Sequence, residues 1–309
     1  MLGRKRSSGL TAVHLQSDRV DVARIARTGL RPRVELCTSF PNRGNELETL
    51  SQARKRLHLD RHRCATLLPS TDYRLQLLEA PNVPEPEIKA ATRWRLKDAL
   101  DYPVDAATVD VFFVPSDPAA PTRARLLYAV AASNERIGAC MNLFAQARLP
   151  LAVIDIPEMA QRNLAALFEV ERRALALLSF TEQRGLLTFT CGGELYVART
   201  IETGLAAMAA AQGDLRAQLF ERIVLEVQRS LDHFERQFSA LPVARLLLAP
   251  MPEEVGLHAH LAQNLYVPVE VARLEAVLDL QEVPDLAVPE NQSRSFLALG
   301  AALREEALQ

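Results

Sequence analysis

The 309-residue sequence is poor in the residues that mark several large protein classes. Aromatic residues make up only 6%, and the four cysteines form no C-x-x-C pair. This spacing excludes a disulfide scaffold and a cysteine-framed zinc site. No apolar run approaches the roughly 18 residues that span a bilayer, so no transmembrane helix is expected. The 49% of hydrophobic and 24% of charged residues are typical of a chain that buries a substantial core.

Charge and motifs exclude further classes. Lys and Arg number 36 and Asp and Glu 38, a net charge of −2, which predicts no bulk attraction to nucleic acid. The twelve glycines form neither a P-loop nor a dinucleotide-binding fingerprint, and no nucleophile elbow is present. His58 and His62 stand four apart, but arginines and a lysine surround them, so we predict no metal site. The role of this basic stretch, 54–63, stays open between a solvated surface and phosphate contacts.

The order of apolar runs predicts two halves built alike. Each half begins with three consecutive short strands and continues with helices that alternate with single strands. The Gly192-Gly193 dipeptide predicts a two-residue hairpin between the last two strands of the second group. This order is typical of two RNase H-like domains that face a cleft, an actin-like fold of the α/β class with mixed sheets. The predicted domains are 8–156 and 157–309, with an insertion at 64–132 that holds a hairpin (64–79) and a helix (85–101).

The helix of this insertion carries the only tryptophan. Ile88, Thr92 and Leu96 form one apolar stripe, and Trp94 points to the opposite side. Two interpretations follow. Either the insertion packs on both faces of the helix, or Trp94 is an exposed anchor for a partner, since tryptophan is enriched at interface hot spots.

Several segments carry a resemblance to a known family. They are 67–73, 79–84, 90–98 and 102–104 in the first half, and 198–201, 226–232 and 297–304 in the second. On these motifs the chain resembles the PilM-like family of type IV pilus assembly proteins, and the MSHA-type members most closely. The resemblance implies an actin-like ATPase fold and a cytoplasmic location at the inner face of the inner membrane. It also implies binding of a short cytoplasmic segment of a single-pass pilus-assembly protein. A homo-oligomer is left open.

The chain departs from the family at the loops that hold a nucleotide in actin-like proteins. The first loop has His14 and Gln16 and no glycine, the second has Ser179 and Thr181, and the third has Ala249 and Pro250. Bulky side chains and a missing N–H group oppose the close approach of phosphates. We therefore expect a non-catalytic protein without cofactor or metal. The alternative is a PilM-like ATP-binding protein or weak ATPase, with Asp155 holding Mg²⁺.

The partner site is expected on the helix of the insertion. Arg93, Trp94 and Lys97 are the candidate residues, in a cleft between helix 85–101 and the first sheet.

Overall fold

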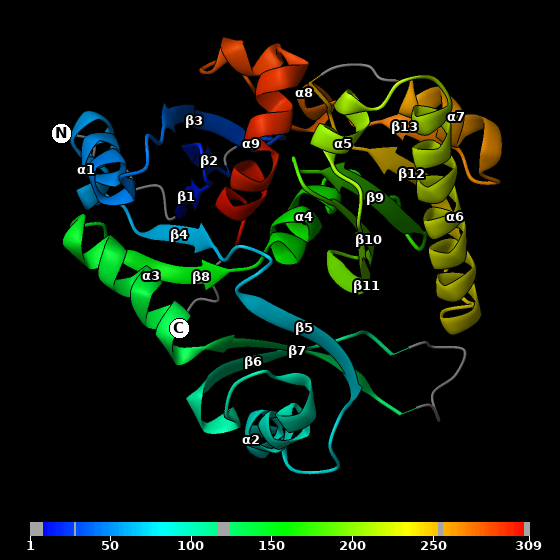
Figure 1. Cartoon of the computed structure of the whole chain (residues 1–309), viewed down its shortest axis with the longest axis horizontal. Helices are drawn as coiled ribbons and strands as arrows, with labels where there is room; N and C mark the ends of the chain where they lie inside the picture. The colour runs from blue at the N-terminus through cyan, green and yellow to red at the C-terminus, as the bar shows by residue number, and fades with distance from the viewer. Residues whose placement is uncertain (1–8, 28, 117–123, 253–255, 306–309) are drawn as a thin grey trace.

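The computed structural model describes residues 9–27, 29–116, 124–252 and 256–305. Two five-stranded sheets form the body of the molecule, and a smaller three-stranded sheet lies below them in Figure 1. In both large sheets, three antiparallel strands are extended by two parallel strands. The predicted α/β class with mixed sheets is confirmed.

The first large sheet has the order β3-β2-β1-β4-β8. Its strands are β1 (Thr11–Leu15), β2 (Arg19–Ala26), β3 (Arg33–Pro41), β4 (Cys64–Leu67) and β8 (Leu151–Asp155). Strands β1, β4 and β8 run parallel, so their amino ends meet at one edge and their carboxyl ends at the other. β8 pairs with β4 and, among the described residues, has no strand on its other side, so it is an edge strand.

Two helices cover one face of this sheet. They are α1 (Glu46–Leu57) and α3 (Asn134–Gln146), which bury Leu50, Ala53 and Phe144 against Val13 and Val22. The Oγ atom of Ser133, the N-cap of α3, accepts a hydrogen bond from the backbone N–H of Arg136 at 3.2 Å. A capping side chain satisfies a donor that the first helical turn leaves free, which explains why α3 begins there.

The second large sheet has the order β11-β10-β9-β12-β13. Its strands are β9 (Ala174–Phe180), β10 (Gly185–Cys191), β11 (Glu194–Ile201), β12 (Val243–Leu248) and β13 (Val269–Val271). The predicted Gly-Gly hairpin joins β10 to β11, and both glycines have a positive φ, of 62° and 74°. Only glycine adopts such backbone angles without steric cost, which is why this turn is so short.

A long helix covers one face of the second sheet. This helix, α6 (Gly213–Gln237), buries an apolar stripe that contains Ile223, Val227, Leu231 and Phe234. These residues recur at spacings of three and four, the pattern of a helix that buries one face. The remaining helices of the second half are α4 (Pro157–Ala165), α5 (Leu205–Ala210), α7 (Leu257–Asn264), α8 (Leu274–Val277) and α9 (Pro289–Ala302).

The small sheet is the insertion. It has the order β5-β7-β6, with β5 (Tyr73–Glu79), β6 (Ala107–Phe113) and β7 (Leu126–Ser133), and α2 (Glu85–Arg95) packs on its outer face. The inner face contacts the second half, where the hydroxyl of Tyr128 accepts a hydrogen bond from the Ala198 N–H at 3.1 Å.

The predicted hairpin at 64–79 is wrong. β4 pairs with β1 and β8 in the first large sheet, whereas β5 pairs with β7. All four residues of β4 are buried, a pattern that suits the interior of a sheet covered on both faces. The three-stranded sheet of the insertion therefore begins at Tyr73 and not at Cys64.

Helices α4 and α9 lie side by side between the two large sheets (Figure 1). Although 157–309 was predicted as the second domain, α9 packs on β1 and β2 of the first sheet. One hydrophobic cluster includes Ala12 and Ile25 of the first sheet, Leu177 of the second, and Leu164 and Leu299 of the two helices. The two halves thus share a core. Among the described residues, no helix has both the length and the apolar character needed to cross a bilayer.

Candidate functional site

A cleft of about 460 Å³ opens where the two halves meet. It lies at the carboxyl ends of β1, β9 and β12, and the amino half of α9 closes one side. Ligands of α/β proteins commonly bind at this end of parallel strands. The structure brings together all six residues singled out in the sequence, because each lines the cleft: His14, Gln16, Ser179, Thr181, Ala249 and Pro250.

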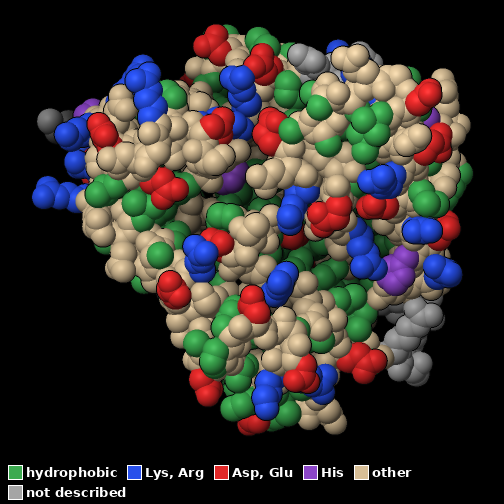
Figure 2. Space-filling model, viewed as in Figure 1, with side chains coloured by type: hydrophobic (Ala, Val, Ile, Leu, Met, Phe, Trp, Pro, Cys, Tyr) green, Lys and Arg blue, Asp and Glu red, His purple; other side chains and the backbone are tan. Residues whose placement is uncertain are grey.

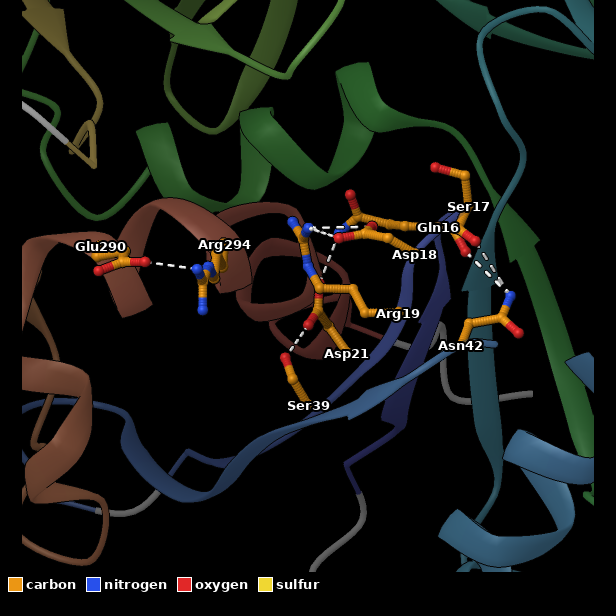
Figure 3. Close-up of polar contacts among 9 residues, drawn as sticks. All are labelled: Gln16, Ser17, Asp18, Arg19, Asp21, Ser39, Asn42, Glu290 and Arg294. Carbon is orange, nitrogen blue, oxygen red and sulfur yellow. Dashed lines mark hydrogen bonds and ion pairs between the residues drawn. The ribbon is translucent and has the colours of Figure 1, made fainter. Parts of the chain in front are cut away.

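The first loop is held by a polar network that the sequence did not reveal (Figure 3). At its centre the buried Asp21 of β2 accepts hydrogen bonds from Gln16 Nε2 at 2.5 Å, from Arg19 Nε at 3.2 Å and from the Ser39 hydroxyl. Arg19 also pairs with Asp18 at 3.0 Å. Burial raises the pKa of Asp21, and its hydrogen bonds and the Arg19 charge oppose the rise. In the sequence, this network could have been recognised from Arg19 and Asp21, which are two positions apart and therefore lie on one face of β2.

His14 faces the cleft as a neutral base. Burial and the nearby Arg19 charge lower its pKa to about 4. Its Nδ1 atom is buried without a hydrogen-bond partner among the described residues. A neutral imidazole supplies neither a positive charge for a phosphate nor the hard oxygen ligand that Mg²⁺ prefers.

The second loop is tied to its own surroundings. The Ser179 hydroxyl donates to Gln161 Oε1 at 2.5 Å, and Gln161 donates in turn to Thr188 Oγ1 at 3.0 Å. The Thr181 hydroxyl donates to the carbonyl of Arg184 at 3.0 Å. Gly204 lies directly beneath, where an added Cβ would come within 2.3 Å of the backbone carbon of Gln183. The side chains of this loop are therefore engaged within the protein.

The third loop and α9 complete the wall. The Ala249 N–H donates to the carbonyl of Leu178 at 2.8 Å, and Pro250 has no N–H to offer. On α9, Arg294 is paired with Glu290 (Figure 3). The cations of the cleft, Arg19 and Arg294, thus already have carboxylate partners.

These residues fit a magnesium triphosphate poorly. Phosphate cradles use backbone N–H groups on glycine-rich turns and unpaired cations, and the loops described above supply neither. Asp155 is ion-paired with Arg304 at 2.5 Å and accepts the Ile156 N–H at 2.9 Å, so a cation there would have to displace a guanidinium group. Within the described ranges, no three His, Cys, Asp or Glu side chains gather as metal ligands.

The predicted partner residues lie elsewhere. Helix α2 is on the outer face of the small sheet, far from the first large sheet in Figure 1, so the expected cleft between them is wrong. Arg93 donates to the carbonyls of Val104 and Asp105, both at 2.8 Å, and so braces the following loop. Trp94 is 62% exposed, which excludes packing on both faces of the helix, and Lys97 is exposed.

An apolar groove of about 320 Å³ runs between α3 and β8. No feature of this groove was predicted from the sequence. Its lining includes four consecutive residues of β8, Leu151 to Ile154, together with Met141, Ala145 and Leu149. Consecutive residues of a strand point to opposite faces, so a groove that touches all four lies along the edge of the strand. Met141 is 55% exposed. In the sequence, the spacing of four between Met141, Ala145 and Leu149 could have indicated this apolar surface.

No protein-family model matches the chain, and no curated protein matches it. Solved structures do. A structure described as a PilM-PilN type IV pilus biogenesis complex is 20% identical over 96% of this chain and 98% of that chain, with a TM-score of 0.73. A Bacteroides thetaiotaomicron protein of unknown function with an actin-like ATPase fold is 8% identical over 91% and 96%, with a TM-score of 0.53. The cytoplasmic domain of EpsL, an inner membrane component of the Vibrio cholerae type II secretion system, is 13% identical over 97% of both chains, with a TM-score of 0.51. The chain has the actin-like fold, as predicted.

Proposed function

We propose that this protein is a non-catalytic cytoplasmic adaptor of type IV pilus biogenesis, of the MSHA-type MshI kind. It binds a short cytoplasmic segment of an inner-membrane partner and is held at the inner face of that membrane. The similar structures support this assignment in part, because one is described as a pilus complex of PilM with PilN and another as an inner-membrane component of a secretion system. The proposed function is to bind a peptide, not to turn over a nucleotide.

The groove between α3 and β8 is the observation that carries the proposal. A strand at the edge of a sheet presents N–H and C=O groups that an extended peptide can pair with, and β8 has no described strand on its outer side. The flanking apolar surface of Met141, Ala145 and Leu149 offers contacts for alternate side chains of such a peptide. Backbone pairing supplies affinity and the apolar contacts supply specificity.

The experiment titrates peptides that match the cytoplasmic tails of small pilus-assembly membrane proteins against the purified protein. Met141→Glu places a charge in the groove, and we expect it to weaken binding at least about tenfold, since burying an unpaired carboxylate is costly. Leu225→Glu is the matched control, because Leu225 is 44% exposed on α6 and lies outside the groove.

The outcomes separate the candidate surfaces. If Trp94→Ala abolishes binding and Met141→Glu does not, the partner docks on α2 as the sequence predicted. If no tail binds the unmodified protein, the adaptor function itself is refuted.

The second candidate is a PilM-like ATP-binding protein or weak ATPase, which the fold favours and the cleft residues oppose. Calorimetry with Mg-ATP distinguishes the two. We expect no saturable heat at micromolar to millimolar nucleotide, because the loops around His14, Thr181 and Pro250 contain no glycine-rich turn, and the cations Arg19 and Arg294 are paired with carboxylates. Micromolar affinity would establish that the chain binds ATP and would contradict the expectation that the cleft holds no nucleotide.

A further inference from the structure

The amino ends of the parallel strands of the first sheet share one edge, opposite the interdomain cleft. Two backbone hydrogen bonds join the segments that lead into β1, β4 and β8. The Thr11 N–H donates to the Arg63 carbonyl at 2.9 Å, and the Cys64 N–H donates to the Pro150 carbonyl at 2.8 Å. Helix α1 ends at the same edge, because only residues 58–63 separate it from β4. We call this surface the basic edge and define it by six residues: Arg54, Lys55, Arg56, Arg61, Arg63 and Arg148.

The basic edge concentrates positive charge on a chain whose net charge is −2. Five of its six side chains are exposed and Arg54 is half-buried. Within 54–63 and 147–150, Asp60 is the only acidic residue. Figure 2 shows Lys and Arg side chains standing out along the margin of the molecule over α1. Like charges gathered in this way repel one another unless an anionic surface faces them.

Four cations of the basic edge, Arg54, Lys55, Arg61 and Arg148, differ from the arginines beside it in their ion pairing. On the neighbouring β2–β3 connection, Arg27 pairs with Glu305 at 2.9 Å and Arg33 with Asp279 at 3.1 Å. By contrast, Arg54, Lys55, Arg61 and Arg148 form no ion pair with any described residue. The carboxyl end of the α1 dipole favours cations in the last turn of that helix, but Arg61 and Arg148 lie outside this turn.

We propose that the basic edge docks directly on an anionic phospholipid bilayer. Clusters of about four to eight Lys and Arg side chains are attracted to anionic lipid headgroups, and the basic edge gathers six of them from the end of α1 and the adjoining turns. Each cation near such a surface strengthens partitioning about fivefold at moderate salt.

Nucleic acid is the less favoured ligand. Single strands bind on exposed aromatic rings, and the aromatic side chain that touches the basic edge, Phe40, is 3% exposed beneath the Arg56 guanidinium group. The cations lie on a helix end and on turns, and they are spread along the edge of the sheet. This arrangement suits the broad, flat surface of an anionic bilayer.

The proposal orients the molecule but does not rest on the proposed peptide binding. With the basic edge on the bilayer, the interdomain cleft points away from the membrane. The groove between α3 and β8 includes Leu149 and Leu151, so one end of it lies beside Arg148 of the basic edge. A peptide leaving the bilayer would reach it directly.

The test is sedimentation of the full chain with vesicles of one-third phosphatidylglycerol in phosphatidylcholine, compared with vesicles of phosphatidylcholine alone. We expect binding to the anionic vesicles that falls as salt rises, and none to the neutral ones. The triple variant Lys55→Gln, Arg56→Gln, Arg61→Gln should lose at least about tenfold in partitioning. The matched triple Arg222→Gln, Arg229→Gln, Arg236→Gln on the exposed face of α6 removes the same charge and should change it less than about twofold.

Three results would overturn the proposal. They are no binding of the unmodified chain to anionic vesicles, an equal loss in both triple variants, and tighter binding of duplex DNA through the same three residues. Circular dichroism of both variants checks that the fold is intact. The peptide titration is carried out without vesicles, so either proposal fails independently of the other.

Discussion

At the scale of single residues, the polar side chains of the interdomain cleft are occupied by one another. Asp21 accepts hydrogen bonds from Gln16, Arg19 and Ser39, and Ser179 donates to Gln161. Each contact satisfies a group that would otherwise be buried without a partner. A ligand that needed these groups would have to break bonds already made, which is the residue-level reason to expect weak nucleotide binding.

His14 makes stability depend on acid pH. Its pKa is lowered from 6.5 to about 4 in the fold, so between these values the unfolded chain binds a proton that the folded chain does not. Stability therefore falls as the pH drops from 6.5 to 4, by about 2 to 3 kcal/mol. His14→Gln should remove this loss in urea titrations at the two pH values.

An exposed histidine is the control for that experiment. His58→Asn changes an exposed imidazole at a position with φ of 53°, which asparagine tolerates. If His14→Gln shows the same pH slope as the unmodified protein, the imidazole is not held neutral by burial.

Trp94 should be dispensable for folding. Because 62% of its surface is exposed, Trp94→Ala is expected to change the free energy of unfolding by less than about 1 kcal/mol. Phe144→Ala in the core beneath α1 and α3, where the side chain is fully buried, should cost about 3 to 5 kcal/mol. Chemical denaturation measures both, and a loss of several kcal/mol at Trp94 would mean that it packs in the core.

At the scale of elements, the close crossing of α4 and α9 joins the two halves. An added Cβ at Gly300 of α9 would come within 2.1 Å of the Ala160 carbonyl oxygen on α4. Asn163 of α4 donates to the Gly300 carbonyl at 2.9 Å. The atoms in this contact belong to the backbone, so no side chain can rotate aside to make room for an added methyl group.

Two glycine substitutions should have opposite effects. Gly300→Ala must separate α4 from α9, and we expect a loss of more than about 2 kcal/mol. Gly138→Ala lies in α3 with nothing within 4 Å of the added Cβ, so the gain in helix propensity should stabilise by up to about 1 kcal/mol. Thermal denaturation of the two variants measures the difference. Equal effects would show that the crossing is not as tight as described.

At the scale of the whole molecule, one hydrophobic cluster joins the two halves. The hydrophobic cluster around α4 and α9 contains residues of both large sheets, and Tyr128 bonds the small sheet to β11. Each half would lose part of its buried surface, the part in the shared cluster, if the other unfolded.

The molecule should therefore unfold in one step. We expect a single calorimetric transition whose measured enthalpy equals the van't Hoff enthalpy. Two resolved transitions, or a calorimetric enthalpy well above the van't Hoff value, would mean that the halves unfold separately, as a strict division at 156 and 157 implies.

Most elements could be predicted from the sequence because their signals are local. The spacing in α6, the Ser133 cap of α3 and the Gly192-Gly193 turn each depend on neighbours within a few residues. The hairpin at 64–79 failed because pairing is not local. The apolar segment Cys64–Leu67 is compatible with a hairpin when its sequence is considered alone. In the fold it is buried on both faces and lies between β1 and β8.

The sequence by itself determined the order of elements, the duplication of the halves and the cleft loops that lack glycine, since these follow from periodicity, turn residues and side-chain size. Tertiary structure alone decided the role of Arg93, the groove beside β8 and the basic edge. These features join residues far apart in the chain, and only the pairing of parallel strands brings Arg63, Arg148 and the end of α1 to one edge.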